Sequence, residues 1–221
     1  MRSSDNSNLG AFEYCNTELT WSNHYLWPVL RRLVETRDWS ERRAFEIGCG
    51  NGAIANLLST LGFAVTGVDP SESGIAVARK AYPHLHVAVG DAYDDLAGRY
   101  GTFPLVVSLE VIEHCFYPRR FARTFYDLIE PGGVGVLSTP YHGYLKNLAL
   151  ALANQWDDHL GPLWDGGHIK FFSARTLRAL LEEVGFQRIE FIRVGRIPPL
   201  AKSLVAIARK CEGTARPERG S

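Results

Sequence analysis

The chain has 221 residues, 46% of them hydrophobic, and its 24 basic and 24 acidic side chains give a formal net charge of zero. This length suits one domain with a sizeable core, and the balanced charge argues against a long nucleic acid or an anionic membrane as the partner. Four scattered cysteines, a polar amino terminus and the lack of a long apolar run lead us to expect a cytoplasmic protein without structural zinc or disulfides.

Strand-like and helix-like segments alternate along most of the chain. An apolar stripe at helical spacing predicts a helix over residues 21–36. Strands are then predicted at residues 43–47, 64–68, 85–89, 104–109 and 133–138, and helices at residues 53–61, 71–81, 118–130 and 173–184. Ser71 is expected to cap its helix, Pro118 to occupy a first turn, and residues 130–133 to stop a helix and turn. This alternation is typical of a parallel sheet.

The last part of the chain departs from the alternation. Strand-like runs at 187–194 and 202–208 are joined too briefly for a crossover helix, so these strands must be antiparallel. We therefore predict an α/β fold: a Rossmann-like, seven-stranded mixed sheet, parallel except for a carboxyl-terminal antiparallel hairpin, with helices on both faces. Its expected parts are an N-terminal helical lid segment (1–42), the main domain (43–210) and a flexible tail (211–221).

One long insertion, over about residues 141–167, fits neither pattern. It carries apolar residues at helical spacing, and long insertions in compact domains are usually lids or binding elements. A surface helix packed on the domain is the plainer alternative. Contact with a membrane is a weaker one, because Lys146 is the only basic residue on this helix.

A glycine-rich turn follows the first predicted strand. Residues 45–52 read Phe-Glu-Ile-Gly-Cys-Gly-Asn-Gly, and Asp69 ends the next strand. Glycines let the backbone turn tightly and approach a ligand, and a carboxylate such as Asp69 can accept hydrogen bonds from two ribose hydroxyls. A nicotinamide dinucleotide is compatible with this motif. Glu46, however, would repel a pyrophosphate and attract a cationic amino-acid group, which favours S-adenosylmethionine.

Further motifs follow the third and fourth strands, as Gly90-Asp91-Ala92 and as Ser108-Leu-Glu-Val-Ile-Glu-His114. With the glycine turn, they resemble the class I S-adenosylmethionine-dependent methyltransferases over about residues 43–209. Within that class, they are similar to the ubiquinone-biosynthesis O-methyltransferases and the small-RNA terminal 2′-O-methyltransferases. The resemblance implies that the cofactor is bound by Glu46, Gly48, Cys49, Gly50, Gly52, Asp69, Asp91, Ala92 and Leu109. Glu46 and the glycine turn would hold the methionine end, Asp69 the ribose, and Asp91 with Ala92 the adenine.

The same resemblance implies a divalent metal, because a Glu-x-x-Glu-His run is associated with one in parts of both groups. The implied ligands are Glu110, Glu113, His114 and His168. One turn of helix would bring the first three together, and His168, at the start of the last helix, could close the site. Such a set suits Mn²⁺, Fe²⁺, Co²⁺ or Zn²⁺ at least as well as Mg²⁺. Without a metal, His114 or His168 would be the general base, in a catalytic group completed by Glu113.

The predicted reaction is methylation of a small-molecule hydroxyl, either a phenol or one of a vicinal diol, which could chelate the metal. The expected acceptor pocket consists of Trp21, His24, Tyr25, Tyr141, His142 and Trp164. A metal-independent methyltransferase acting on nitrogen, carbon or another oxygen stays open. RNA methylation is disfavoured by the balanced charge. An NAD-dependent reductase is disfavoured because no tyrosine is followed four residues later by lysine. A non-catalytic cofactor-binding protein is the remaining alternative.

Overall fold

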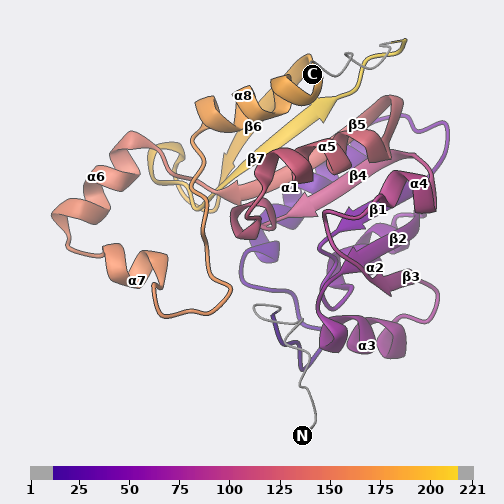
Figure 1. The fold of residues 1–221 in the computed structure, drawn as a ribbon, viewed down its shortest axis with the longest axis horizontal. Helices are drawn as coiled ribbons and strands as arrows, with labels where there is room; N and C mark the ends of the chain where they lie inside the picture. The colour runs from indigo at the N-terminus through magenta and orange to yellow at the C-terminus, as the bar shows by residue number, and fades with distance from the viewer. Residues whose placement is uncertain (1–11, 214–221) are drawn as a thin grey trace, which may run out of the picture.

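The fold is built on one central sheet with the strand order β3-β2-β1-β4-β5-β7-β6 (Figure 1). In this computed structural model, residues 12–213 are described, so the outer parts of the predicted lid segment and tail lie outside the described residues. The strands are β1 (Arg43–Ile47), β2 (Ala64–Asp69), β3 (His86–Val89), β4 (Phe103–Leu109), β5 (Ile129–Pro140), β6 (Arg188–Val194) and β7 (Ser203–Arg209). Strands β1 to β5 are parallel, and β7 is antiparallel to both β5 and β6. The predicted fold class is therefore confirmed.

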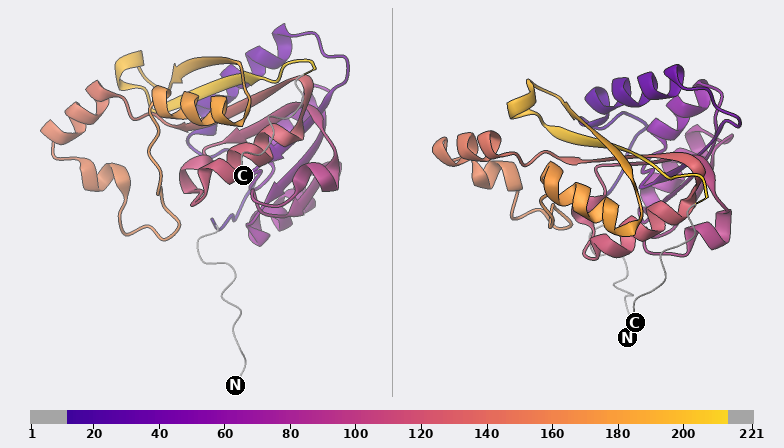
Figure 2. Two further views of the ribbon diagram at one scale, coloured as in Figure 1. Left: turned by 45° about the horizontal axis from the view of Figure 1, so that its top comes forward. Right: turned by 90° about the horizontal axis from the view of Figure 1, so that it is seen from above.

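Helices cover both faces of this sheet (Figure 2). One face carries α1 (Asn23–Thr36), α2 (Ala53–Thr60) and α3 (Glu72–Ala81), and the other carries α4 (Leu96–Tyr100), α5 (Pro118–Leu128) and α8 (Ala174–Val184). Two further helices of the insertion, α6 (Tyr144–Leu152) and α7 (Trp156–Leu160), project away from the sheet (Figure 1). Short 3₁₀ helices are η1 (Ile112–His114) and η2 (Pro198–Leu200). No helix in the described part of the chain is long and apolar enough to cross a membrane.

The central strands are apolar on both sides because both faces are covered. Along β4, Val106 packs in the layer of α4, α5 and α8, while its neighbours Leu105 and Val107 pack in the layer of α1, α2 and α3. Phe125 of α5 is fully buried, and a Cβ on Gly135 of β5 would lie 2.6 Å from its ring. Glycine at 135 thus lets α5 approach the sheet closely.

Some predicted boundaries are wrong, and tertiary contacts explain why. Helix α5 ends at Leu128, and the predicted stop and turn at 130–133 belongs to β5, because Ile129 pairs with Phe103 and the backbones of Gly132 and Gly133 bond to Lys210. The five-residue α4 was not predicted. Helix α8 begins at Ala174, so His168 lies in the loop before it. The Ser71 cap and the position of Pro118 are confirmed.

The parallel arrangement brings the carboxyl ends of β1, β2, β4 and β5 to one edge of the sheet. The glycine turn, Asp69, the acidic stretch after β4 and the start of the insertion all follow these ends. In open α/β sheets, ligands bind at this edge. The topology thus collects the predicted site residues from distant parts of the chain.

Removing the Phe125 ring tests the packing of α5 on the sheet. We expect Phe125→Ala to lower the free energy of unfolding by about 3–5 kcal/mol, because it leaves a cavity between fully buried neighbours. Urea denaturation measures the change. Tyr144→Ala, at a side chain that is 78% exposed, is the control and should stay within about 0.5 kcal/mol. A Phe125→Ala effect no larger than this control would contradict the described core.

Candidate active site

A cavity of about 840 Å³ opens at the carboxyl edge of the sheet. Four parts of the chain contribute to its wall: the segment before α1 with the first residue of that helix, the glycine turn with the end of β2, the stretch after β4, and the loop before α8. The lining residues are Phe12, Glu13, Tyr14, Thr20, Trp21, Ser22, Asn23, Glu46, Gly48, Cys49, Asn51, Ile54, Asp69, Pro70, Leu109, Glu110, Val111, His114, Trp164, Asp165, Gly166 and His168.

The glycine turn is held in shape by Asp69. Its Oδ2 accepts a hydrogen bond from the Gly50 N–H and its Oδ1 accepts one from the Ser71 N–H, both at 2.8 Å. Gly48 and Gly50 have φ angles of 78° and 49°, in the left-handed region that glycine adopts without strain. Burial raises the pKa of Asp69, and the two backbone donors oppose that shift. The carboxylate keeps lone pairs for further donors.

Glu46 is the buried acid of this end of the cavity. It is 3% exposed, and its Oε2 has no hydrogen-bond partner among the described residues. Burial, reinforced by the nearby charge of Asp69, raises the pKa of Glu46 to about 8. A buried carboxyl with an unpartnered oxygen is suited to a cationic ligand group, which would favour its ionised form.

An aromatic residue that the sequence analysis missed covers the glycine turn. The Tyr14 hydroxyl lies so close to Gly50 that a Cβ there would collide with it, and the Tyr14 N–H donates to Ser73 Oγ at 3.0 Å. The Asn51 side chain fastens this segment by donating to the carbonyls of Asn16 and Glu18, each at 2.9 Å. Burial, then the charges of Asp69 and Glu46, raise the pKa of Tyr14. The segment has no periodic pattern from which this position could be predicted.

Glu110 also lines the cavity, in a strained backbone conformation with a φ of 55°. Its Oε1 accepts from the Ser138 hydroxyl at 2.7 Å, and its Oε2 accepts from the Ser203 hydroxyl at 3.1 Å. Because Ser203 donates to Glu110, its oxygen accepts the hydrogen bond from the Tyr25 hydroxyl, at 3.1 Å. Burial raises the pKa of Glu110 to about 7, while these hydroxyls and Lys146 act against the shift.

Glu113, His114 and His168 form the cluster that resembles a metal site. One ligand atom from each residue lies within 4.8 Å of the others. The loop before α8 reaches this place because the N–H groups of Ile169 and Lys170 both donate to the Glu113 carbonyl at 2.9 Å. Glu110, predicted as a fourth ligand, is not in the cluster, since η1 starts after it and the two serines hold its carboxylate.

The donor atoms of this cluster fit a divalent cation. Glu113 is fully buried, and neither of its carboxylate oxygens has a hydrogen-bond partner among the residues described. His114 Nδ1 lies 2.7 Å from the Gly166 carbonyl, so Nδ1 carries the proton and Nε2 is left as a lone-pair donor. Burial, then the charge of His114, lowers the pKa of His168 to about 4, which keeps that imidazole neutral.

Several predicted site residues do not line the cavity. Asp91 is exposed and its Oδ1 accepts from the Tyr93 N–H at 2.8 Å, which is a turn contact. Ala92, next to it, and the glycines at 50 and 52 are also absent from the wall. Of the predicted acceptor pocket, Trp21 and Trp164 line the cavity, Tyr25 supports it through Ser203, and the others do not: His24, Tyr141 and His142.

Comparison with known proteins agrees with this geometry. A protein-family model described as "Methyltransferase domain" matches residues 21–190. The chain belongs to this family. A ubiquinone biosynthesis O-methyltransferase of Caulobacter vibrioides is 38% identical over 125 residues, which cover 52% of this chain and 49% of that protein. This methyltransferase domain thus spans about half the length of that relative. The predicted resemblance to the ubiquinone-biosynthesis O-methyltransferases is confirmed.

Solved structures share the fold at low identity. A SAM-dependent methyltransferase from Archaeoglobus fulgidus matches with a TM-score of 0.62 at 18% identity, over 84% of this chain and 93% of that one. The [4+2]-cyclase SpnF matches with a TM-score of 0.65 at 15% identity, over 94% and 88%. These likenesses show the fold alone, and a methyltransferase-like fold is evidently compatible with different chemistry.

Replacing Asp69 by asparagine tests how the glycine turn is held. The amide has one acceptor oxygen and a donor where the second carboxylate oxygen was, so one of the two backbone N–H groups loses its partner. We expect Asp69→Asn to lower the free energy of unfolding by about 1–3 kcal/mol. Denaturation with urea is the measurement, and Asp38→Asn, an exposed site, is the control. Equal stability of the two variants would show that Asp69 does not hold the turn.

Proposed function

We propose that this chain is an S-adenosylmethionine-dependent methyltransferase that methylates a small-molecule hydroxyl, either a phenol or one of a vicinal diol. The observation that supports this most strongly is a single cavity whose wall includes two acids, Glu46 and Asp69, and two imidazoles, His114 and His168. The first pair suits a cationic nucleoside donor, and the second suits an acceptor that must lose a proton.

For the cofactor, we propose that Glu46 pairs with the α-ammonium group and that Asp69 accepts from the ribose hydroxyls, with Leu109 beside the methionine chain. The unpartnered Oε2 of Glu46 supports this role. A dinucleotide is disfavoured, because its pyrophosphate would face the same carboxyl. The adenine role of Asp91 with Ala92 stays a prediction, since these residues lie outside the cavity wall.

In the proposed reaction, the methyl carbon moves from the sulfonium sulfur to the acceptor oxygen. The C–S bond breaks as the C–O bond forms, its electron pair stays on sulfur as a thioether, and the hydroxyl proton leaves to a base. Because the donor is already activated, the protein mainly aligns and deprotonates the acceptor. The proposed proton acceptors when no metal is bound are Nε2 of His114, whose Nδ1 donates to the Gly166 carbonyl, and the neutral ring of His168.

We further propose that Glu113, His114 and His168 hold a divalent metal. When bound, it would supply Lewis acidity that lowers the pKa of the acceptor hydroxyl. One carboxylate and two imidazoles favour Mn²⁺, Fe²⁺, Co²⁺ or Zn²⁺ over Mg²⁺. Glu110 then acts on the acceptor side as a hydrogen-bonded wall residue instead of as a ligand. The main alternative is a metal-independent methyltransferase, in which one of the imidazoles alone is the base.

The segment before α1 and the insertion over 141–167 are proposed to act as lids, since both contribute residues to the cavity wall. Exposed apolar side chains on α6, namely Leu145, Leu148 and Leu152, keep membrane contact by the insertion as a weaker prediction. We also propose the cytoplasm as the location. Cys15, Cys49 and Cys115 are thiols in the described part of the chain, which supports this location, because disulfides are rare in that reducing compartment.

The metal proposal predicts that a chelator abolishes methylation of catechol by labelled S-adenosylmethionine and that Mn²⁺ or Co²⁺ restores it. Glu113→Gln and His168→Ala should each weaken Mn²⁺ binding by at least about tenfold in equilibrium dialysis, since a lost ligand or outer partner typically costs that much. Glu183→Gln, at a surface ion pair with Arg119, is the control. Activity that survives both chelation and Glu113→Gln would favour the metal-independent alternative.

The pKa of Glu46 predicts how cofactor binding depends on pH. Below about pH 8 the free protein holds Glu46 protonated, and pairing with an ammonium group requires its ionised form, so binding must release a proton. Cofactor affinity should therefore rise from pH 6 toward about 8 and fall above it, where an α-amino group loses its own charge. Calorimetry in phosphate and in Tris measures the released proton. Glu46→Gln should remove that release, and an unchanged value would contradict the assignment.

A further inference from the structure

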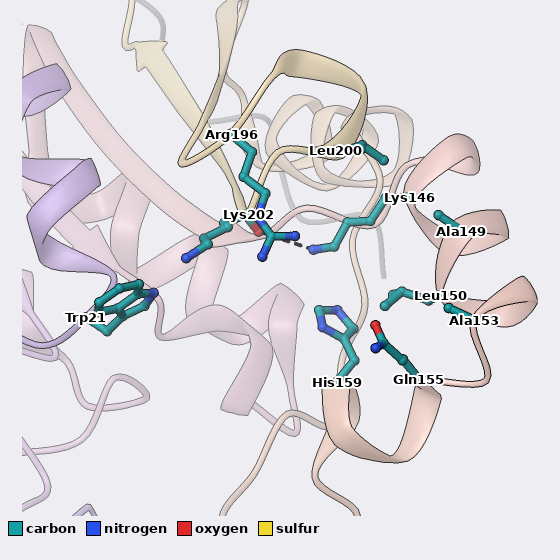
Figure 3. Close-up of a pocket in the computed structure, with 10 residues that line it drawn as sticks. All are labelled: Trp21, Lys146, Ala149, Leu150, Ala153, Gln155, His159, Arg196, Leu200 and Lys202. Atoms are coloured by element: carbon teal, nitrogen blue, oxygen red, sulfur yellow. Dashed lines mark hydrogen bonds between the residues drawn. The ribbon is translucent and has the colours of Figure 1, made fainter.

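A second cavity has a volume of about 380 Å³, and Figure 3 shows the residues that line it. The insertion and the connection between β6 and β7 form most of its wall, and Trp21 lines both cavities. Its lining residues are Trp21, Lys146, Ala149, Leu150, Ala153, Gln155, His159, Arg196, Leu200 and Lys202. Three of them are cations, and no carboxylate is among them. The proposed donor-binding and metal-binding residues all lie outside this wall, so the chemistry described above does not account for these charges.

The central cation is buried and has little to neutralise it. Lys146 is 8% exposed, and its only hydrogen bond within residues 12–213 is a long one of 3.5 Å to the Lys202 carbonyl. In the described part of the chain, neither Lys146 nor its two neighbours, Arg196 and Lys202, forms an ion pair. A buried ammonium with one long hydrogen bond and no ion pair is rare in proteins because its desolvation is costly. This side chain thus faces a cavity that suits an anion.

The three positively charged side chains also repel one another. The Lys146 and Arg196 side chains direct their charged ends into the same space, and Lys202 reaches toward Trp21, with its Nζ 4.4 Å from the ring centroid (Figure 3). Burial, then the charge of Arg196, lowers the pKa of Lys146 to about 8, and the same two cations oppose protonation of His159. An oxyanion among them would remove this repulsion and accept charge-assisted hydrogen bonds.

The second cavity is adjacent to the acceptor end of the first. Ser203, which donates to Glu110 in the first cavity, directly follows Lys202 in the second. The charge of Glu110 also acts on Lys146. Trp21 forms the shared part of the wall. One molecule could therefore place a hydroxyl near His114 and His168 and a charged group between the cations.

We propose that the methyl acceptor carries an oxyanion, a carboxylate or a phosphate, which binds Lys146, Arg196 and Lys202. This inference rests on the proposed function, since it concerns the acceptor of that reaction. The competing anion is the carboxylate of the donor's methionine part. We assign the cations to the acceptor because the glycine turn, Glu46 and Leu109 line only the first cavity.

The experiment compares acids with their neutral amides. Wild-type protein is given 3,4-dihydroxybenzoate, 3-(3,4-dihydroxyphenyl)propanoate and 3,4-dihydroxyphenyl-methyl phosphate, each beside an uncharged analogue: the two amides and 3,4-dihydroxybenzyl alcohol. Binding by calorimetry and kcat/KM for methylation are both measured. The variants are Arg196→Gln, at an exposed side chain, and Lys202→Gln. Arg123→Gln on α5 is the control, because it removes one exposed positive charge far from the cavity in sequence and on another helix.

We expect at least one acid to bind about tenfold or more tightly than its neutral analogue, as charge-assisted hydrogen bonds allow. That preference should fall to about twofold or less in Arg196→Gln and Lys202→Gln and persist in Arg123→Gln. Comparing the two carboxylates with the phosphate ester shows which kind of oxyanion the cations bind. Dissociation of S-adenosylmethionine should not change in Arg196→Gln.

Three results would overturn the inference. In the first, the wild-type protein binds no acid more tightly than its neutral analogue, or binds none of the compounds. In the second, the preference for an acid persists in both Arg196→Gln and Lys202→Gln. In the third, Arg196→Gln binds S-adenosylmethionine more weakly, which would assign the cations to the carboxylate of the donor. Failure of the proposed function alone would give a different result. The acids would still bind to the wild-type protein and bind more weakly to the variants, but no compound would be methylated.

Discussion

The burial of carboxyl groups at the carboxyl edge of the sheet is the constraint on which the site depends. Glu46, Asp69, Glu110 and Glu113 lie near the ends of three neighbouring strands; Glu46, Asp69 and Glu113 are buried, and Glu110 is half-buried. Taking a carboxylate out of water costs free energy unless donors or a cation replace its hydration. Each group must therefore be protonated, hydrogen-bonded or paired with a ligand, and burial raises the pKa of all four.

The protein itself satisfies two of these groups. Backbone N–H groups hold Asp69, and two serine hydroxyls hold Glu110. Glu46 and Glu113 instead keep oxygen atoms that no described residue contacts by a hydrogen bond. The satisfied acids shape the wall, whereas the unsatisfied ones suit cationic groups, which in the proposed function are an ammonium group at Glu46 and a metal ion at Glu113.

Local pattern was enough to predict the sheet, the closing hairpin and the glycine turn, because apolar runs, short connections and missing side chains are properties of neighbouring residues. The remaining features depend on distant contacts. His168 joins Glu113 through backbone bonds of Ile169 and Lys170, which no spacing reveals. Glu110 is not part of the ligand cluster because Ser138 of β5 and Ser203 of β7 donate hydrogen bonds to its carboxylate. No periodic pattern surrounds Tyr14, and the local sequence does not reveal that Asp91 lies outside the cavity wall.

The fold alone does not determine which molecule is methylated, since a cyclase has the same fold at a TM-score comparable to that of a methyltransferase. That choice rests with elements added to the sheet: the segment before α1, the insertion, and the connection between β6 and β7. They enclose a cavity that is basic around Lys146, whereas the neighbouring edge of the sheet is acidic around Glu110. An acceptor that spans both must present a proton-losing hydroxyl to one end and an anion to the other. The opposite charges therefore set its orientation as well as its class.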